Sequence, residues 1–124
     1  MVTTAHTSKD VRIFWKEARS LAAAGHEVTL LCPQTGDSVA EGVRFVGLDL
    51  GGTRRRIRAT LGVWRAFRQA RRLGAEVFHF HDPELMNAGL ILALLGTRVV
   101  YDAHEDFPRT VLTKPYLPRW VCSP

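Results

Sequence analysis

The chain has 124 residues, of which 46% are hydrophobic, and a formal net charge of +5. A chain of this length builds one ordinary domain with a core of its own and is too short for two. No apolar run approaches the roughly 20 residues of a membrane span, and two cysteines without a CxxC pair indicate neither a disulfide framework nor a zinc site, so we expect one cytoplasmic domain.

The opening of the chain predicts a β-α-β arrangement. Residues 1–5 (MVTTA) are typical of the last part of a buried strand, and we expect that the beginning of this strand is missing. Asp10 is a good N-cap for a helix that Gly25 ends, and residues 26–32 (HEVTLLC) predict the next strand. The apolar residues of this helix recur at helical spacing, at Val11, Phe14, Ala18, Leu21 and Ala22.

The polar loop before this helix has residues that could bind a ligand. His6, Lys9 and Arg12 lie at the sheet edge that the first strand reaches, where they could hold an anionic or polyol ligand near a helix N-terminus. The loop has no glycine, whereas a dinucleotide-binding turn needs G-x-G-x-x-G. Since P-loop and G-x-S-x-G motifs are also absent from the sequence, it disfavours an NAD-type cofactor, a P-loop nucleotidase and a hydrolase.

The middle of the chain predicts a short strand near a sheet edge, at residues 43–48, and a strongly basic helix at residues 54–73. From Arg54 to Arg72 the sequence has eight arginines and no acidic residue. Without these arginines the chain would have more acidic than basic residues. Because the excess of positive charge lies in this one segment and is not spread over the whole surface, it argues against a nucleic-acid partner.

The basic helix has two different sides. At 100° per residue, one side carries the arginines that fall within about 40° of each other, namely Arg54, Arg58, Arg65 and Arg72. The opposite side, which we expect to pack on the sheet, carries Ile57, Leu61, Trp64 and Phe67. The arginine side is either a solvated helix face or a contact for anionic lipid head groups or phosphates.

A second β-α-β unit follows. Residues 77–81 predict a strand, residues 82–95 a helix that Gly96 ends, and residues 97–101 a parallel strand. Because such crossovers are right-handed in nearly all cases, both strands end on the edge where ligands bind in open α/β sheets. We therefore expect the polar side chains after the two strands to converge, namely His81, Asp82, His104, Glu105 and Asp106.

The residues after the first of these strands have both structural and functional interpretations. Asp82 and Pro83 suit the N-cap and the first position of a helix. Glu84 either complements the helix dipole or binds a hydroxyl-rich ligand. His81 points into the crevice or beneath the helix, and His79 is typical of a hydrogen-bonded core histidine.

His104 is the strongest candidate for a functional residue. It lies past a strand end and is followed by two acids that no capping pattern requires, although a solvated loop histidine would look the same. The acids and histidines at this edge lack the spacing of a metal site, so we expect no metal. Taken together, the elements predict an α/β fold, a Rossmann-like parallel sheet of about five strands with helices on both faces.

The sequence resembles the N-terminal domain of bacterial family 4 glycosyltransferases, which have the GT-B fold, in the stretches TTAHTSKDVRIFWKEARSLAAAGHEVTLLCP, VFHFHDPELMNAGL and VVYDAHEDFPRTVLTKPYLP. The resemblance implies two Rossmann-like domains facing a cleft, of which the N-terminal one holds the sugar acceptor and the C-terminal one the nucleotide-sugar donor. This chain would be a truncated acceptor-side domain without the donor domain, and we expect no catalysis from it alone.

The resemblance further implies a reaction. A nucleotide sugar would be the donor and a saccharide or a lipid-linked molecule the acceptor, in polysaccharide or glycoconjugate biosynthesis. Transfer would retain the anomeric configuration and would need neither a cofactor nor an essential metal. The enzyme would be cytoplasmic or peripheral on the inner face of the plasma membrane.

The resemblance also implies roles for individual residues. His104 corresponds to the family's histidine at the catalytic cleft, which touches the transferred sugar. Residues 4–12 and 81–84 would form walls on the acceptor side, and Glu105 and Asp106 would line the same cleft. The implied substrate-binding residues are His6, Lys9, Arg12, His81, Glu84, Glu105 and Asp106. The paired glutamates of the family's donor site have no counterpart in this sequence.

Two other functions stay open on the sequence. The chain could be a non-catalytic remnant that binds a membrane surface or a partner through its arginines. It could also belong to a nucleotide-sugar epimerase, which shares the two-domain architecture. The succession of HDPEL and YDAHED favours the transferase.

Overall fold

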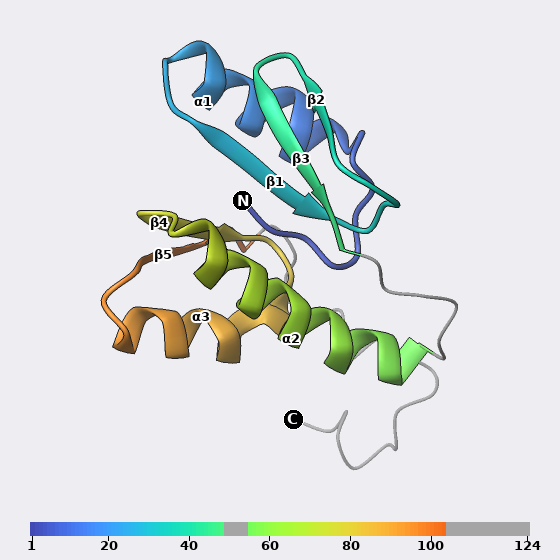
Figure 1. Ribbon diagram of the computed structural model, residues 1–124, viewed down its shortest axis with the longest axis vertical. Coiled ribbons are helices and arrows are strands. Elements are labelled where there is room, and N and C mark those ends of the chain that lie inside the picture. Colours follow the sequence, from blue (N-terminus) through green and yellow to red (C-terminus); the bar gives the residue numbers. More distant parts are fainter. Residues whose placement is uncertain (49–54, 104–124) are drawn as a thin grey trace, which may run out of the picture.

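The computed structural model describes residues 1–48 and 55–103, with the main chain alone for residues 55–60. Helices cover both faces of the strands (Figure 1). The strands are β1 (Val28–Cys32), β2 (Ser38–Ala40), β3 (Val43–Gly47), β4 (Val77–Phe80) and β5 (Arg98–Tyr101). The helices are η1 (Val11–Ala18), α1 (Arg19–Ala23), α2 (Arg55–Leu73), η2 (Pro83–Leu85) and α3 (Met86–Leu94).

The strands form two groups that the N-terminal residues join. β1 pairs in parallel with β3, and β4 pairs in parallel with β5. Val2 makes parallel bridges to Leu31 of β1 and to Phe80 of β4. Its N–H donates to the carbonyl oxygen of His79 at 2.8 Å. The first residues of the chain therefore lie between β1 and β4 and hold the two groups together (Figure 1).

The α/β class is as the sequence predicts, but the described strands do not form the expected parallel sheet of about five strands. They form a three-stranded sheet in the order β1-β3-β2 and a two-stranded sheet of β4 and β5. β2, a strand that was not predicted from the sequence, is antiparallel to β3. The two residues between them, Glu41 and Gly42, both have positive φ, 51° and 76°, as a tight hairpin turn requires.

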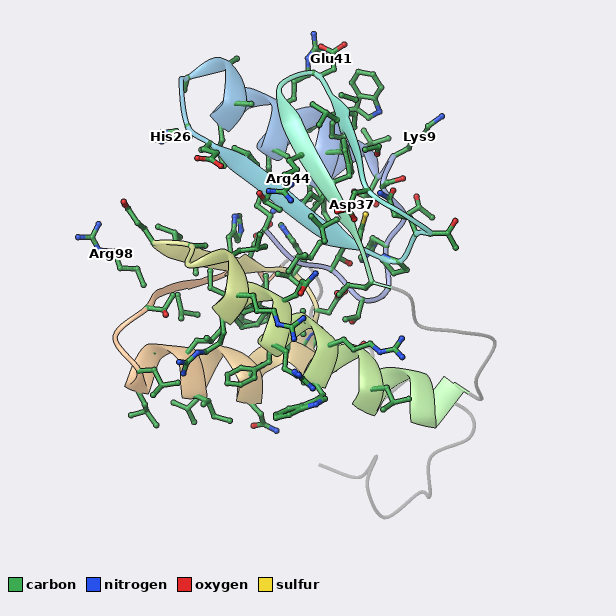
Figure 2. All side chains as sticks on the ribbon, in the orientation of Figure 1. Lys9, His26, Asp37, Glu41, Arg44 and Arg98 are labelled. Carbon is green, nitrogen blue, oxygen red and sulfur yellow. The ribbon has the colours of Figure 1, made fainter. Side chains whose placement is uncertain are left out.

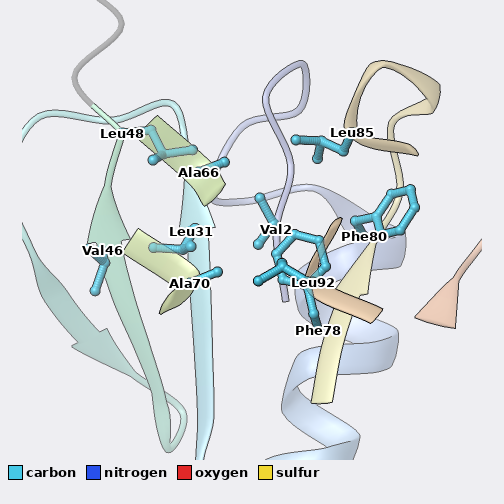
Figure 3. Packing of buried hydrophobic residues seen from close by; sticks show 10 residues of the cluster. All are labelled: Val2, Leu31, Val46, Leu48, Ala66, Ala70, Phe78, Phe80, Leu85 and Leu92. Carbon is cyan, nitrogen blue, oxygen red and sulfur yellow. The ribbon is translucent and has the colours of Figure 1, made fainter. Parts of the chain in front are cut away.

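Two hydrophobic clusters fill the space on the two faces of the strands. On one face, η1 and α1 cover β1 and β3, with Ile13, Phe14 and Leu30 among the buried residues. On the other face, α2, η2 and α3 cover all the parallel strands (Figure 3). Successive side chains of β4 point to opposite faces of the strand. Phe78 and Phe80 point into the second cluster, whereas His79 and His81 point to the layer of η1.

Helix α2 packs through a different side from the one expected. Its buried residues are the small ones, Gly62, Ala66 and Ala70, whereas Leu61 and Trp64 are 37% and 56% exposed. Small side chains let the backbone of the helix come close to the strands, and bulky ones fit only outside this contact. The predicted packing side was therefore wrong for Leu61 and Trp64, while Phe67 is partly buried as expected, and Ile57 falls among the residues whose side chains are not described.

Helix α3 packs directly on β4 because it has a glycine at the contact. A Cβ atom on Gly89 would lie 2.7 Å from Cε1 of Phe80, which is closer than such atoms approach in proteins. The helix itself ends as the sequence predicts, at Gly96 with φ +90°. Within the described ranges, no helix is both long and apolar enough to cross a bilayer.

Candidate functional site

The ends of β4 and β5 lie side by side at one edge of the sheet. The strands are parallel, as the sequence predicts, and the Asp102 N–H donates to the carbonyl oxygen of Phe80 at 3.0 Å just beyond them. His81 Nδ1 is 3.5 Å from Asp102 Oδ2. The expected partners at this edge, His104, Glu105 and Asp106, lie outside the described residues. We call the polar residues gathered here the rim: Thr3, Thr4, His6, Arg12, Glu17, His79, His81, Asp82, Glu84 and Asp102.

Asp82 ties the N-terminal loop to the turn after β4. Its buried carboxylate accepts hydrogen bonds from Thr3 Oγ1 at 2.9 Å and from the Thr4 N–H at 2.6 Å, and its Oδ2 also lies 3.3 Å from Thr4 Oγ1. The sequence analysis expected an N-cap, and Asp82 does occupy that position, but its side chain makes no capping hydrogen bond. The predicted position is therefore confirmed, but the capping hydrogen bond is absent, because the carboxylate binds donors of a loop about 80 residues away in sequence.

Glu84 stands at the exposed side of the same turn. Its Oε1 accepts a hydrogen bond from Thr4 Oγ1 at 2.6 Å, so Thr4 lies between the carboxylates of Asp82 and Glu84. The Glu84 side chain is exposed, unlike that of Asp82. A carboxylate held at one oxygen and open to solvent is a good acceptor for the hydroxyl groups of a ligand.

The first loop brings His6 to the rim but not Lys9. His6 Nε2 lies 3.7 Å from Asp82 Oδ1, and His6 Nδ1 lies 3.2 Å from Asp10 Oδ2. Asp10 caps η1 as predicted, because its Oδ1 accepts from the N–H groups of Arg12 and Ile13, and the bond from Ile13 does most to lower the pKa of Asp10. Lys9 is exposed and points away from the strands (Figure 2).

Arg12 is held by two carboxylates at the rim. Its Nη2 donates to Asp102 Oδ1 at 2.9 Å and to Oδ2 at 3.0 Å, and its Nε lies 3.1 Å from Glu17 Oε1. The Asp102 carboxylate does most to raise the pKa of Arg12. The guanidinium thus joins the start of η1 to the end of β5.

The unusual geometry of η1 makes the contact of Arg12 with Glu17 possible. The sequence predicts an α-helix, in which residues five apart point about 140° away from each other. The structure has a π-helix instead, with i to i+5 hydrogen bonds from the Arg19 N–H to the Phe14 oxygen and from the Trp15 N–H to the Asp10 oxygen. Each turn then holds more residues, so Arg12 and Glu17 come to the same side.

Two histidines lie beneath this charged group. The rings of His79 and His81 are 4.6 Å apart, and the fully buried His81 has its Nε2 3.7 Å from Glu17 Oε2. Burial lowers the pKa of His79, and the positive Met1 ammonium lowers it further. Burial also raises the pKa of Glu17, as does Asp102, against the opposite effect of Arg12. The environment therefore favours a neutral imidazole at His79.

Four side chains of the rim are of types that bind metals. Donor atoms of Glu17, His79, His81 and Asp102 all lie within 4.8 Å of one another. Arg12 brings a positive charge to both carboxylates. Together with Arg12, these four side chains form a charge network that joins η1 to β4 and β5.

The sequence analysis missed Glu17 and Asp102. Asp102 follows β5 directly, so the rule that ligands gather at the ends of parallel strands could have found it. Glu17 could not have been found, because its place at the rim depends on the π-helix. Of the predicted residues, the structure brings His6, Arg12, His81 and Glu84 together and leaves Lys9 outside.

Two hollows in the described part of the molecule lie next to the strands, and one of them touches the rim at His79. One of about 630 Å³ lies at the opposite ends of β1 and β4, between His26 and Glu76 among others. Another, of about 220 Å³, lies between α2 and the end of α3. Apart from His79, the rim residues line neither of these two hollows, so we describe the rim as a polar wall.

Two of the four predicted contact arginines lie in another part of the molecule. Arg65 and Arg72 are exposed on α2, on the face of the strands opposite to η1, and so do not take part in the network of Arg12. Arg54 and the side chain of Arg58 lie outside the described residues.

Comparison with known proteins gives one match. A family model with the description "Glycosyltransferase Family 4" matches residues 11–123, which is nearly the whole chain. No curated protein and no solved structure matches the chain.

Proposed function

The chain belongs to glycosyltransferase family 4, and from this premise we propose that it forms the acceptor side of a retaining glycosyltransferase. The donor is a nucleotide sugar and the acceptor a saccharide or a lipid-linked molecule, in polysaccharide or glycoconjugate biosynthesis. In this proposal, a second domain of the full protein holds the donor. No cofactor and no essential metal takes part.

The rim is the observation that supports an acceptor site here. The loop of Thr4 and His6 and the turn of Glu84 come from distant parts of the sequence, and Asp82 fixes one to the other. Hydroxyl groups, carboxylates and an imidazole in one wall are the groups that recognise a sugar through its hydroxyls. Their rigid attachment keeps the ordering cost of binding low.

The proposed chemistry needs the acceptor hydroxyl beside the anomeric carbon of the donor. A bond forms between the acceptor oxygen and that carbon as the bond to the diphosphate breaks. His104 follows Asp102 by two residues, and Asp102 is anchored by Arg12 and Phe80. We assign to His104 the orientation of the reacting sugar and the stabilisation of charge in the transition state.

The substitution His104→Ala tests this assignment in the full protein that carries this sequence. We expect turnover with radiolabelled nucleotide sugars to fall by about 100-fold or more, because misplaced reactants lose that much. The circular dichroism spectrum and the melting temperature should not change. His26→Ala is the matched control, since His26 lies at the far end of β1 (Figure 2).

Two results would contradict the proposal. Turnover close to the wild type in His104→Ala would remove this residue from the site. A product that is an epimer of the donor sugar, with no sugar on any acceptor, would identify an epimerase in place of a transferase.

A further inference from the structure

Four side chains of the rim converge from three elements of the fold. Glu17 lies on η1, His79 on β4 and His81 just after it, and Asp102 follows β5. One donor atom from each of the four comes within 4.8 Å of the other three. The expectation of no metal rested on spacing along the chain, and such spacing cannot reveal a group that folding assembles from separate elements.

Two of these side chains hold a buried polar atom without a hydrogen bond. Glu17 Oε2 and His79 Nε2 are closed to solvent and make no hydrogen bond within the described ranges. Glu17 Oε2 lies 3.7 Å from His81 Nε2, which is too far for a hydrogen bond. Because buried polar atoms in proteins nearly always have a partner, atoms of this kind indicate a water or an ion between them.

The spacing of the four donor atoms fits one ion after small shifts. Atoms within 4.8 Å of one another fit inside a sphere with a radius of about 2.9 Å, whereas zinc binds N and O ligands at about 2.0–2.1 Å. Each donor atom therefore has to move by less than about 1 Å, which small side-chain rotations supply. The side chains of Glu17 and Asp102 are 23% and 21% exposed, so an ion can enter from their side.

The helix η1 brings Glu17 to the histidines by an uncommon geometry. In an α-helix the side chains of Arg12 and Glu17 would point away from each other, and the π-helix puts them on the same side. Departures of this kind from the α-helix are rare, and they occur frequently at functional sites. The distortion lies where the chain brings a carboxylate to two imidazoles.

The charges in the group are compatible with a divalent cation. Arg12 Nε lies 3.1 Å from Glu17 Oε1, which leaves Oε2 of the same carboxylate for another partner. Two carboxylates and two neutral imidazoles make a neutral complex with a divalent ion. Arg12 then has the part of an outer partner that orients the carboxylates, as the hydrogen-bonding partners of metal ligands commonly do.

We propose that these four side chains bind one zinc ion. Zinc takes imidazole nitrogens and carboxylate oxygens in tetrahedral sites, whereas magnesium and calcium prefer oxygen ligands alone. Four ligands from the protein leave no open position on the ion, so its role is structural. It holds η1 to the ends of β4 and β5 and takes no part in the sugar transfer, and the proposal does not depend on that function.

Titration of the whole chain with zinc tests the proposal without any enzyme assay. After removal of metals with EDTA, competition with a chromophoric chelator should give one zinc ion per chain, and excess magnesium should not displace it. With zinc at about 100 times its Kd, the melting temperature should rise by about 10 °C, because zinc binds the folded chain.

Substitution of single ligands locates the ion. Glu17→Gln and His79→Gln should each weaken zinc binding by about 100-fold or more, since even the loss of an outer partner costs about 10- to 100-fold. The matched controls Glu27→Gln and His26→Gln change the same side chains at exposed positions before β1 and should bind zinc like the wild type. Circular dichroism establishes that the variants are folded.

Cobalt(II) in place of zinc reports on the ligands without any substitution. We expect the visible absorption of tetrahedral cobalt with nitrogen and oxygen ligands, and no charge-transfer band from sulfur. A sulfur band would instead place the ion at one of the two cysteines, Cys32 or Cys122.

Three outcomes would overturn the proposal. One is the absence of zinc binding at micromolar concentrations, which would leave the four side chains as a charge network with water between them. Another is an equal affinity for zinc in the ligand variants and their controls, which would mean that zinc binds elsewhere on the chain. The third is a sulfur band in the cobalt spectrum.

Discussion

The rim and the exposed side of α2 that carries Arg65, Arg68 and Arg72 use charged residues in opposite ways. At the rim, Arg12 lies between two carboxylates, and Asp82 accepts hydrogen bonds from Thr3 and Thr4 of a loop distant in sequence. On α2, three exposed arginines share one side of a helix that has no carboxylate. Charges with partners inside the fold stabilise it, whereas charges of one sign on an exposed side contribute little to folding. The difference indicates that the charges at the rim hold parts of the fold together, whereas the arginines of α2 do not.

The largest effect that this comparison predicts is on stability at Asp82. Asp82→Ala should lower the free energy of unfolding by about 2–4 kcal/mol, because it leaves buried donors of Thr3 and Thr4 without their acceptor. Asp82→Asn keeps one acceptor oxygen and should cost less. Urea unfolding measures both. A loss below about 1 kcal/mol for the alanine variant would show that the loop does not depend on this carboxylate.

A smaller effect is expected for the contact of Arg12 with Asp102. Arg12→Gln and Asp102→Asn should each destabilise the fold less than Asp82→Ala, because the guanidinium is largely exposed. Their effects should not add, since each removes the same contact. A double-mutant cycle by urea unfolding at low and high salt measures this coupling. Strict additivity at low salt would mean that the pair contributes nothing to the attachment of η1.

A change of pH should separate the two regions further. Burial lowers the pKa of His79 in the folded state below the ordinary value near 6.5. Below pH 6.5 the unfolded chain therefore binds more protons than the folded one, and stability falls with falling pH. Glu17 has the opposite effect, because its pKa in the folded state is raised above the ordinary value of 4.5. Between these two pKa values the folded chain binds more protons than the unfolded one, and stability rises with falling pH.

His79→Gln isolates the histidine in this experiment. The variant should lose less stability than the wild type between pH 7.5 and pH 5.5, as measured by melting temperature at each pH. The control is the substitution of the exposed His26 by glutamine, whose melting temperatures between pH 7.5 and pH 5.5 should follow those of the wild type. Parallel pH curves for wild type and His79→Gln would contradict the effect of burial on His79.

The smallest effect on stability is expected when the exposed arginines of α2 are replaced. The triple substitution of Arg65, Arg68 and Arg72 by glutamine should change the free energy of unfolding by no more than about 0.5 kcal/mol, because these side chains are exposed. Urea unfolding measures the change. A large loss would mean that the arginines hold the fold together, and the contrast between the two regions would disappear.

Local patterns in the sequence were enough to predict the unit of β4, α3 and β5. Hydrophobic spacing, the helix end at Gly96 and the rule for parallel crossovers placed His81 at the same edge as the end of β5. Asp10 was also predicted correctly as a cap, because capping depends on neighbouring residues. These features all follow from interactions within one short segment or between consecutive elements.

Features that depend on distant parts of the chain were not predictable. The partners of Asp82 come from the first loop, and Glu17 reaches the rim through a π-helix that no periodicity indicates. The packing of α2 through Gly62, Ala66 and Ala70 shows a further reason. Hydrophobicity alone favours Trp64 as the buried residue, but the space between helix and strands accepts only small side chains.

The KM for the acceptor, measured in a Glu84→Gln variant, tests most directly whether the rim is the acceptor side of a sugar transfer. Glu84 is exposed at the rim, so the substitution should not affect folding. In the full protein that carries this sequence, the KM for the acceptor should rise about tenfold, since a hydrogen bond to a charged group contributes about 1.5 kcal/mol or more, and the KM for the nucleotide sugar should not change. An unchanged KM for the acceptor, or a rise only in that for the donor, would contradict the assignment.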